Sequence, residues 1–363
     1  MGARELARLG TRILGSNFRD PALPWKLTLI LTYRCQLRCT MCDIWKRRPE
    51  GELDADELRR FFRANPGFSW VNVSGGEIFL RPDLADLFDA IREECRDLYL
   101  LDFPTHGQQT DRIVDHVGRL VASRIPRLYV TVSIDGPPAL HDEIRGVDGA
   151  FEKAITTFGK LRGIRRRGYR PFLGMTLQPK NADAIEDTIA AVQERVPEFD
   201  ARELHVNLVH ESSHYYGNDG VATLDADAAR RAMDRVRKLR GTSLHPVALL
   251  ERRYQRLGAR WLDAERTPLP CHAASSSIFV DSLGNVRPCS IWDRLLGNLR
   301  DHDYSLAKLF EAAGIAEVRR DARTGNCPNC WTPCEAYQSI LSNLVPGVRR
   351  GAKSNGTNGA SGR

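Results

Sequence analysis

Three cysteines in the segment CQLRCTMC, namely Cys35, Cys39 and Cys42, have the residue type and the spacing of a metal-ligand set. They directly follow the apolar run Leu27–Leu31, which predicts a strand. Three thiolates leave one position open on a four-coordinate metal ion or cluster iron, so the site can bind a substrate or cofactor, whereas four-ligand sites are usually structural. Spacing alone leaves two other interpretations: three free thiols on a loop, or a zinc site completed elsewhere.

A second group of five cysteines lies beyond residue 245, in the order Cys271, Cys289, Cys327, Cys330 and Cys334. Residues 284–289 form a G-x4-C segment, and the segment CPNCWTPC follows later. The ninth cysteine, Cys95, lies in a helical pattern and is expected to be a small buried residue. Nine cysteines in a chain without an export signal favour metal or redox chemistry over disulfides.

The elements that must position these residues form an α/β pattern. Between Lys26 and about Val209, short apolar runs alternate with longer amphipathic stretches, which is typical of βα units around a parallel sheet. The six expected strands are Leu27–Leu31, Trp70–Val73, Leu98–Phe103, Leu128–Ile134, Phe172–Leu177 and Leu204–Val209. The expected helices are Asp54–Ala64, Asp83–Glu94, Asp111–Ser123, Phe151–Arg167, Ala182–Arg195 and Asp225–Arg240. In barrels of this kind the chemistry lies at the C-terminal ends of the strands.

Further motifs fall at these strand ends. Ser74–Glu77, with the sequence SGGE, follows the second strand. Ser133–Pro137 and His141–Gly146 follow the fourth strand, and Pro104–Gly107 ends the third. The cysteine spacing, the GGE motif and the two segments after the fourth strand resemble the radical S-adenosylmethionine (SAM) superfamily. The resemblance implies a partial (β/α)6 TIM-type barrel in which the three cysteines hold a 4Fe–4S cluster and SAM chelates its fourth iron. One electron would then cleave SAM to methionine and a 5′-deoxyadenosyl radical.

The same resemblance implies contacts to SAM. Gly75, Gly76 and Glu77 would receive its amino group, Ser133 would meet its ribose, and Arg145 would pair with its carboxylate. The alternative for these residues is a set of turns and a surface ion pair. His106 departs from the family, because relatives usually have Thr-Asn-Gly at this strand end.

The C-terminal cysteines resemble SPASM/twitch domains, in which a β-hairpin and a short helix hold auxiliary 4Fe–4S clusters. Ser277–Asp281 and Asn285–Arg287 would be the hairpin strands. Five cysteines favour one auxiliary cluster, held by Cys271, Cys289 and two of Cys327, Cys330 and Cys334. A zinc site with four cysteine ligands is the alternative.

The loop after the sixth strand, His210–Asn218, is rich in groups that exchange protons and hydrogen bonds. Its place at a strand end makes it the candidate for substrate contact. The candidate catalytic residues on this loop are His210, Glu211, His214 and Tyr215.

Composition sets the remaining expectations. The chain has 363 residues, 42% of them hydrophobic, and a net charge of +7 that is spread along the chain, so we expect a globular protein that binds no nucleic acid. No apolar run is long enough to span a membrane, and no signal core is evident, which favours a cytoplasmic location. Residues 3–18 predict an amphipathic helix packed on the main domain, with membrane-surface contact as the alternative.

Four segments follow: an N-terminal helical extension over residues 1–25, a radical SAM core over 26–244, an auxiliary cluster domain over 245–348 and a disordered tail over 349–363. The expected function is a radical SAM oxidoreductase or modifying enzyme that abstracts hydrogen from a C–H bond, with flavodoxin or ferredoxin as electron donor. About 25 residues before the first strand leave no room for a leader-recognition domain, which favours a sugar-like or cyclitol-like metabolite as substrate. The alternatives are a maturase of a ribosomally made peptide or protein, and a non-catalytic iron–sulfur or zinc protein.

Overall fold

The computed structural model describes residues 2–123 and 125–345. The strands are β1 Lys26–Thr32, β2 Trp70–Gly75, β3 Leu100–Thr105, β4 Arg127–Ser133, β5 Tyr169–Leu177, β6 Leu204–Leu208, β7 Ser277–Val280, β8 Asn285–Arg287 and β9 Gly297–Asn298. The α-helices are α1 Ala3–Ser16, α2 Ala55–Ala64, α3 Leu84–Glu94, α4 Thr110–Ala122, α5 Pro138–Arg145, α6 Ala150–Gly163, α7 Ile185–Arg195, α8 Ala226–Arg240, α9 Pro246–Ala264, α10 Leu306–Ala312, α11 Ile315–Thr324 and α12 Pro333–Leu341. Short 3-10 helices are η1 Ile44–Lys46, η2 Ile78–Leu80, η3 Ala201–Glu203 and η4 Leu299–His302.

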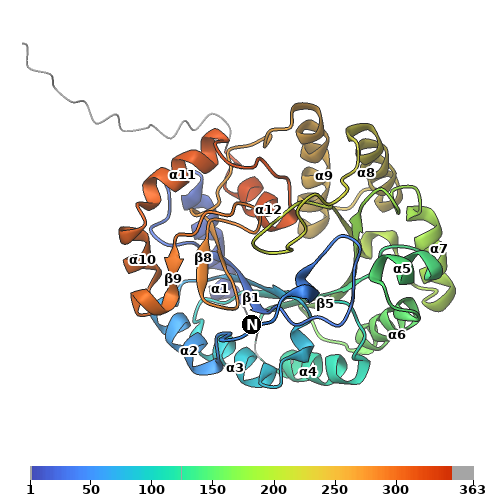
Figure 1. Ribbon diagram of the computed structural model, residues 1–363, viewed down its shortest axis with the longest axis horizontal. Helices are drawn as coiled ribbons and strands as arrows, with labels where there is room; N and C mark the ends of the chain where they lie inside the picture. Colours follow the sequence, from blue (N-terminus) through green and yellow to red (C-terminus); the bar gives the residue numbers. More distant parts are fainter. Residues whose placement is uncertain (1, 124, 346–363) are drawn as a thin grey trace, which may run out of the picture.

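All strands belong to one curved sheet in the order β6-β5-β4-β3-β2-β1-β7-β8-β9 (Figure 1). Pairing is parallel from β6 through to β7 and antiparallel for β8 and β9. The six predicted strands are confirmed with small shifts at their ends, and helices cover the outer face of the sheet (Figure 1). The expected partial barrel of the α/β class is therefore confirmed.

Alternation along the strands separates the helix-covered face from the barrel interior. In β4 and β6 every second residue is buried, and the residues between are only partly buried. The buried set is aliphatic and packs under the helices, as Leu128, Val130 and Val132 do. The other set points into the barrel, and this set supplies the functional cavity.

The C-terminal segment continues the same sheet. β7 pairs in parallel register with β1, from Lys26 opposite Ser277 to Leu29 opposite Val280. Every residue of β1 is buried, and β2 and β7 pair with its two edges. The expected hairpin is present as β7 and β8, and sequence patterns gave no sign that β7 adds a parallel strand to the barrel.

Helix α1 forms within the residues where an amphipathic helix was expected, and it packs on the barrel. Arg12 donates hydrogen bonds to Ser69 Oγ (2.7 Å) and to Asp97 Oδ2 (2.6 Å), next to the N-terminal ends of β2 and β3. Within residues 2–123 and 125–345, no helix is both long and apolar enough to cross a membrane. The expectation of a disordered tail over 349–363 lies outside the described residues.

Candidate active site

A cavity of about 350 Å³ occupies the barrel interior and the C-terminal ends of its strands. Its upper wall carries the three cysteines of the first group and Gly75 and Gly76. Its deeper wall is polar, because inward-facing positions of β2 to β6 carry amide, carboxylate, hydroxyl and imidazole groups. These residues are Asn72, Asp102, Thr131, Ser133, Thr176, His205 and Asn207.

The three cysteines lie on the loop after β1 and line the same cavity. Burial, with a smaller contribution from neighbouring thiols, raises the pKa of Cys35 and of Cys42 to about 12. Burial likewise raises the pKa of Cys39, while the Arg145 guanidinium, 3.7 Å from its sulfur, lowers it. Among the described residues, no three His, Cys, Asp or Glu side chains are placed to hold a single metal ion. An iron–sulfur cluster would take up these thiols as thiolates.

Helix α5, which periodicity did not predict, fixes the cysteine loop. The backbone N–H of Arg38 donates to the carbonyl of Arg145 (3.1 Å), and that of Thr40 donates to the carbonyl of Ile144 (2.9 Å). Gly146 ends the helix in the left-handed region, where a Cβ would lie 2.7 Å from the Arg38 carbonyl oxygen. Pro138 at its start and Gly146 at its end are the sequence signals that could have revealed this short helix.

The two glycines of the GGE motif allow β2 to lie directly against the cysteine loop. A Cβ on Gly75 would lie 2.3 Å from the carbonyl oxygen of Thr32, and one on Gly76 would lie 2.1 Å from that of Arg34. Real Cβ atoms do not approach oxygen this closely, so only glycine fits. The motif therefore brings its backbone to the cavity wall beside Cys35.

Glu77 lies behind this wall and joins β2 to β3. Its Oε2 accepts hydrogen bonds from Thr105 Oγ1 (2.9 Å) and from the His106 N–H (3.0 Å). Burial raises the pKa of Glu77 to about 7. Next to it, His106 lines the cavity, and its Nε2 is buried with no hydrogen-bond partner among the described residues.

Arg145 and Ser133 both line the cavity, as expected for residues that contact SAM. Arg145 already has a carboxylate partner, since its Nη2 lies 2.5 Å from Asp135 Oδ2. Asp135 is fully buried, and its Oδ1 accepts the backbone N–H of Thr176 (2.8 Å). The Nε of Arg145 is buried without a partner among the described residues, so one face of the guanidinium is available to a ligand.

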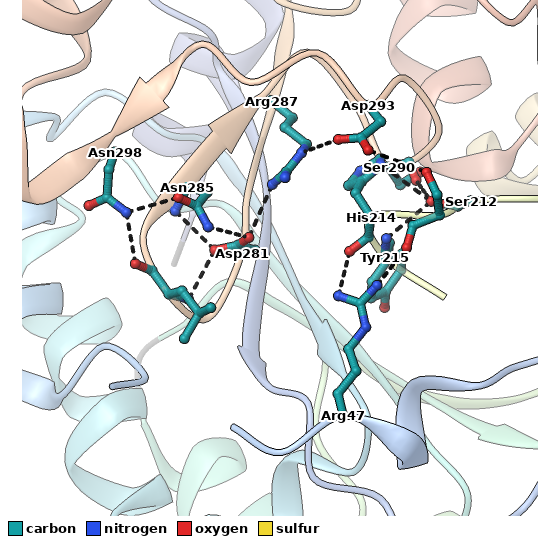
Figure 2. Close-up of polar contacts among 12 residues, drawn as sticks. Arg47, Ser212, His214, Tyr215, Asp281, Asn285, Arg287, Ser290, Asp293 and Asn298 are labelled. Carbon is teal, nitrogen blue, oxygen red and sulfur yellow. Dashed lines mark hydrogen bonds and ion pairs between the residues drawn. The ribbon is translucent and has the colours of Figure 1, made fainter. Parts of the chain in front are cut away.

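The loop His210–Asn218 bridges the barrel and the C-terminal hairpin (Figure 2). Arg47 donates hydrogen bonds to the carbonyls of His214 and Ser213, both at 2.6 Å. Ser212 Oγ donates to the carbonyl of Ser290 (2.7 Å), and Asn218 Nδ2 donates to the carbonyl of Met41 (2.9 Å). The loop is thus fastened on one side to the cysteine loop and on the other to the segment around Cys289.

This arrangement separates the four expected catalytic residues. His210 lines the cavity, although its Nε2 accepts the Trp331 N–H at 3.2 Å. Glu211 lines a neighbouring cleft. The His214 and Tyr215 rings pack on Phe279 outside the cavity, because the loop folds back over β7. Tyr216 lines the cavity beside Cys35 and Cys42. The sequence of an irregular loop does not reveal which of its side chains faces a cavity.

The second cysteine group surrounds a separate, small cavity. Cys271, Cys289, Cys327 and Cys330 line it together with Glu335. Burial raises the pKa of each of the four thiols, and the neighbouring thiols add to this effect at Cys271, Cys289 and Cys330. Cys334 lies apart from this group and lines the barrel cavity. Cys95 is buried in the core, as expected, and its thiol donates to the Phe68 carbonyl.

Family models match two parts of the chain. Residues 29–192 match the radical SAM superfamily, and residues 271–331 match the SPASM iron–sulfur cluster-binding domain. The chain is a radical SAM enzyme with a SPASM domain. The first domain binds a 4Fe–4S cluster together with SAM, and the second binds an auxiliary cluster. In this radical SAM enzyme the thiols face two separate cavities, a donor arrangement that fits both clusters.

Several relatives of this radical SAM enzyme have names that indicate their activity. It is 27% identical to the AdoMet-dependent heme synthase of Methanosarcina barkeri, over 83% of this chain and 86% of that protein. It is 24% identical to the antilisterial bacteriocin subtilosin biosynthesis protein AlbA of Bacillus subtilis, over 83% of this chain and 64% of that protein. Its fold resembles Streptococcus suis SuiB bound to the precursor peptide SuiA, with a TM-score of 0.53 and 17% identity, over 78% of this chain and 63% of that one.

Proposed function

We propose that this radical SAM enzyme modifies an unactivated C–H bond of a ribosomally made peptide. The observation that carries this proposal is the polar inner wall of the barrel cavity, with Asn72, Asp102 and His205 on three different strands. Asn72 donates a hydrogen bond to Asp102, and the buried Nε2 of His205 has no partner among the described residues. Groups of this kind can orient peptide amides and polar side chains. The names of AlbA and of the SuiB complex support a peptide over the sugar-like metabolite expected from the sequence.

In this proposal Cys35, Cys39 and Cys42 hold the cluster that SAM completes. When bound there, the cluster and SAM would supply the radical chemistry that removes a hydrogen atom from the substrate. The Arg145 guanidinium, beside Cys39 and charged at every working pH, offsets negative charge at the thiolates and can bind the carboxylate of SAM. Ser133 lines the same wall and can donate a hydrogen bond to the ribose.

Two further features prepare the cavity for radical chemistry. The backbone of Gly75 and Gly76 forms an open wall against which the amino group of SAM can lie, while Glu77 holds that wall in place from behind. Met41 packs with Ile144 and Val209 into an apolar cluster at the cavity wall. Apolar side chains at this position exclude water, which protects a reactive intermediate from side reactions.

The auxiliary cluster is proposed to lie between Cys271, Cys289, Cys327 and Cys330, which line the smaller cavity. Flavodoxin or ferredoxin, the donor expected from the sequence, would supply electrons to the enzyme. The loop His210–Asn218 connects the two cluster sites through hydrogen bonds on both sides, so it holds them in a fixed relation.

A second candidate function is the modification of a haem precursor. It is favoured by the 86% coverage of the heme synthase, which is wider than the coverage of AlbA. The two candidate substrates need different cavity walls. A macrocycle needs a broad apolar contact surface, whereas a peptide needs hydrogen-bond partners.

Activity can be tested first without any substrate. The reconstituted enzyme, reduced with dithionite, should convert SAM to 5′-deoxyadenosine, and Cys42→Ala should abolish this conversion. Cys95→Ala, whose thiol lies outside both cavities, serves as the matched control and should retain it. Equal SAM cleavage by the wild type and Cys42→Ala would contradict the assignment of the first cluster.

The substrate class can then be tested by offering the candidate substrates in separate reactions. The enzyme is given SAM, a synthetic peptide encoded by a short reading frame beside its own gene, and iron-coproporphyrin in parallel reactions. A mass change in the peptide alone supports the proposed function. A mass change in the porphyrin alone would replace it with the second candidate.

A further inference from the structure

Asp102 lies deep in the barrel cavity. Asp102 and Pro104 are on the same face of β3, and both line the cavity. Because a strand rises about 3.3 Å per residue, Asp102 lies about 7 Å further than Pro104 from the C-terminal edge of the sheet. Among the described residues that line this cavity, Asp102 is the only carboxylate. The floor of the cavity thus carries a single acidic group.

Two neutral donors hold the Asp102 carboxylate in a fixed direction. Trp70 Nε1 donates to Oδ1, and Asn72, the residue opposite Asp102 on β2, donates from Nδ2 to Oδ2. A carboxylate oxygen has two lone pairs, so each oxygen keeps one for a further hydrogen bond. Among the described residues, no Lys, Arg or His nitrogen lies within ion-pair distance of Asp102. The carboxylate is therefore oriented, but its charge has no ion-pair partner.

Lys26 is the cation that acts on Asp102 from a distance. Burial raises the pKa of Asp102, and the charge of Lys26 offsets this effect only in part. The hydrogen bonds of the Lys26 ammonium go elsewhere, to Gln338 Oε1 (3.0 Å) and to the Cys334 carbonyl, and Nζ lies 4.7 Å from the centroid of the Trp70 ring. A buried carboxylate without a paired cation is unfavourable, and a cationic ligand would remove this cost.

The surrounding wall leaves room for a ligand group and offers it a second contact. Gly174 of β5 lines the cavity without a side chain, and a Cβ there would lie 2.6 Å from Thr131 Cγ2. His205 of β6 lines the same cavity, and its buried Nε2 has no hydrogen-bond partner among the described residues. Burial lowers the pKa of His205, so the imidazole is uncharged at neutral pH and does not repel a cation.

We propose that the floor of the barrel cavity binds a cationic group of the substrate, an ammonium or a guanidinium, through the carboxylate of Asp102. The inference rests on the proposed function and specifies which side chain the peptide presents to the barrel. An arginine or lysine side chain fits, because its charge lies at the end of a long stem that reaches below the strand ends. Binding at Asp102 draws the carbon atoms of that stem through the part of the cavity that faces the cysteine loop.

The first test compares two probes of nearly equal shape and different charge. n-Butylguanidinium carries the cation of an arginine side chain, and n-butylurea is its uncharged counterpart. Their binding to the reconstituted holoenzyme with SAM is measured by saturation-transfer NMR titration, which suits weak ligands. Because hydrogen bonds to charged groups contribute more than those between neutral groups, we expect the guanidinium to bind about tenfold more tightly than the urea.

n-Pentylammonium and 1-pentanol form the same comparison for a lysine side chain. A cation that binds no more tightly than its neutral counterpart in both pairs would overturn the proposal. This comparison uses the wild-type enzyme alone, so it does not depend on the folding of any variant.

Variants then locate the preference for the cation. Asp102→Asn should bind n-butylguanidinium and n-butylurea with equal affinity, and Asp102→Ser is a second uncharged variant if the asparagine form does not fold. Glu211→Gln, in the neighbouring cleft, is the matched control and should keep the full preference. Loss of the preference in Glu211→Gln and its retention in the Asp102 variants would place the cation in that cleft and overturn the proposal.

The peptide that tests the proposed function provides a third test. Each arginine of the peptide is replaced in turn by citrulline, and each lysine by norleucine. One replacement should raise the KM of the wild type about tenfold and leave the KM of Asp102→Asn nearly unchanged, because that variant has already lost the partner of the cation.

The outcomes separate the two levels of the argument. Equal modification of the peptide after every replacement would refute the role of Asp102 and leave the proposed function intact. A peptide that is not modified at all would refute the proposed function, and the probe titrations, which need no turnover, would still decide whether Asp102 binds a cation.

Discussion

The Nδ1 atom of His106 lies 3.0 Å from Oε2 of Glu77, so a buried carboxylate that follows β2 lies against an imidazole that follows β3. Both side chains are almost fully buried, and His106 also faces the cavity. The pair links the GGE wall to the interior of the barrel. His106 stands where relatives usually have the asparagine of Thr-Asn-Gly, and its contact with Glu77 gives it a structural role.

Replacing His106 tests the contribution of this pair to ligand binding. His106→Ala should weaken SAM binding about tenfold, which corresponds to about 1.4 kcal/mol, because it removes a group that lines the cavity and supports Glu77. Calorimetric titration of the reconstituted enzyme with SAM measures the effect. His245→Ala, at the exposed start of α9, is the control, and an unchanged affinity in His106→Ala would refute the role.

Gly76→Ala tests the close packing of β2 on the cysteine loop. The added Cβ would lie 2.1 Å from the Arg34 carbonyl oxygen, so the loop must shift, and we expect destabilisation of about 1–3 kcal/mol together with loss of SAM cleavage. Gly118→Ala in α4 is the matched control. Nothing lies within 4 Å of its Cβ, and it should gain up to about 1 kcal/mol from helix propensity. Thermal unfolding measures the stability of both variants. Equal melting temperatures of Gly76→Ala and Gly118→Ala would show that the close approach of residue 76 to the Arg34 carbonyl is unimportant.

Arg145→Met tests the buried ion pair that supports the cysteine loop. Removal of the guanidinium leaves Asp135 buried without its charged partner, which costs about 3–5 kcal/mol in comparable pairs. We expect a lower melting temperature and poor assembly of the first cluster, with the auxiliary cluster retained. The exposed pair of Arg119 and Asp115 is the comparison, and Arg119→Met should change stability little.

Glu335 should make the stability of the metal-free protein depend on pH. Burial raises its folded-state pKa to about 7 from an ordinary value of 4.5, so the native state binds the proton more tightly than the unfolded state. The free energy of unfolding should therefore fall as the pH rises from about 4.5 to 7, by up to about 3 kcal/mol. Glu335→Gln should be stabilised relative to wild type at pH 8 but not at pH 4.

Urea unfolding at several pH values measures this effect. Glu311→Gln, on the exposed face of α10, is the control and should follow the wild-type curve. Parallel curves for wild type and Glu335→Gln from pH 4 to 8 would show that Glu335 ionises normally in the folded protein.

The barrel could be predicted from the sequence because each βα unit carries its own periodicity. Leu27–Leu31 is apolar except for Thr28, and α2 begins with the capping box of Asp54 and Glu57, so local signals and the final structure agree. The cysteine and glycine motifs likewise fall where short-range spacing determines geometry.

Contacts between distant segments could not be predicted in this way. The parallel register of β7 against β1 joins residues about 250 positions apart, and no local pattern specifies it. The same holds for the loop after β6, whose Tyr216 faces the cavity while Tyr215 turns to Phe279. The different positions of Cys330 and Cys334 also depend on how α12 meets the barrel, since their spacing suits either cavity.

The pairing of β7 with β1 also bears on how the chain can be divided. A fragment that stops at residue 244 would expose the backbone edge of β1 over Lys26–Leu29 and remove α12 from the barrel wall. Exposed strand edges pair with other chains, so such a fragment is prone to aggregate. We therefore expect the two cluster-bearing parts to unfold together, and a replacement for the C-terminal part would have to supply a strand in register with β1.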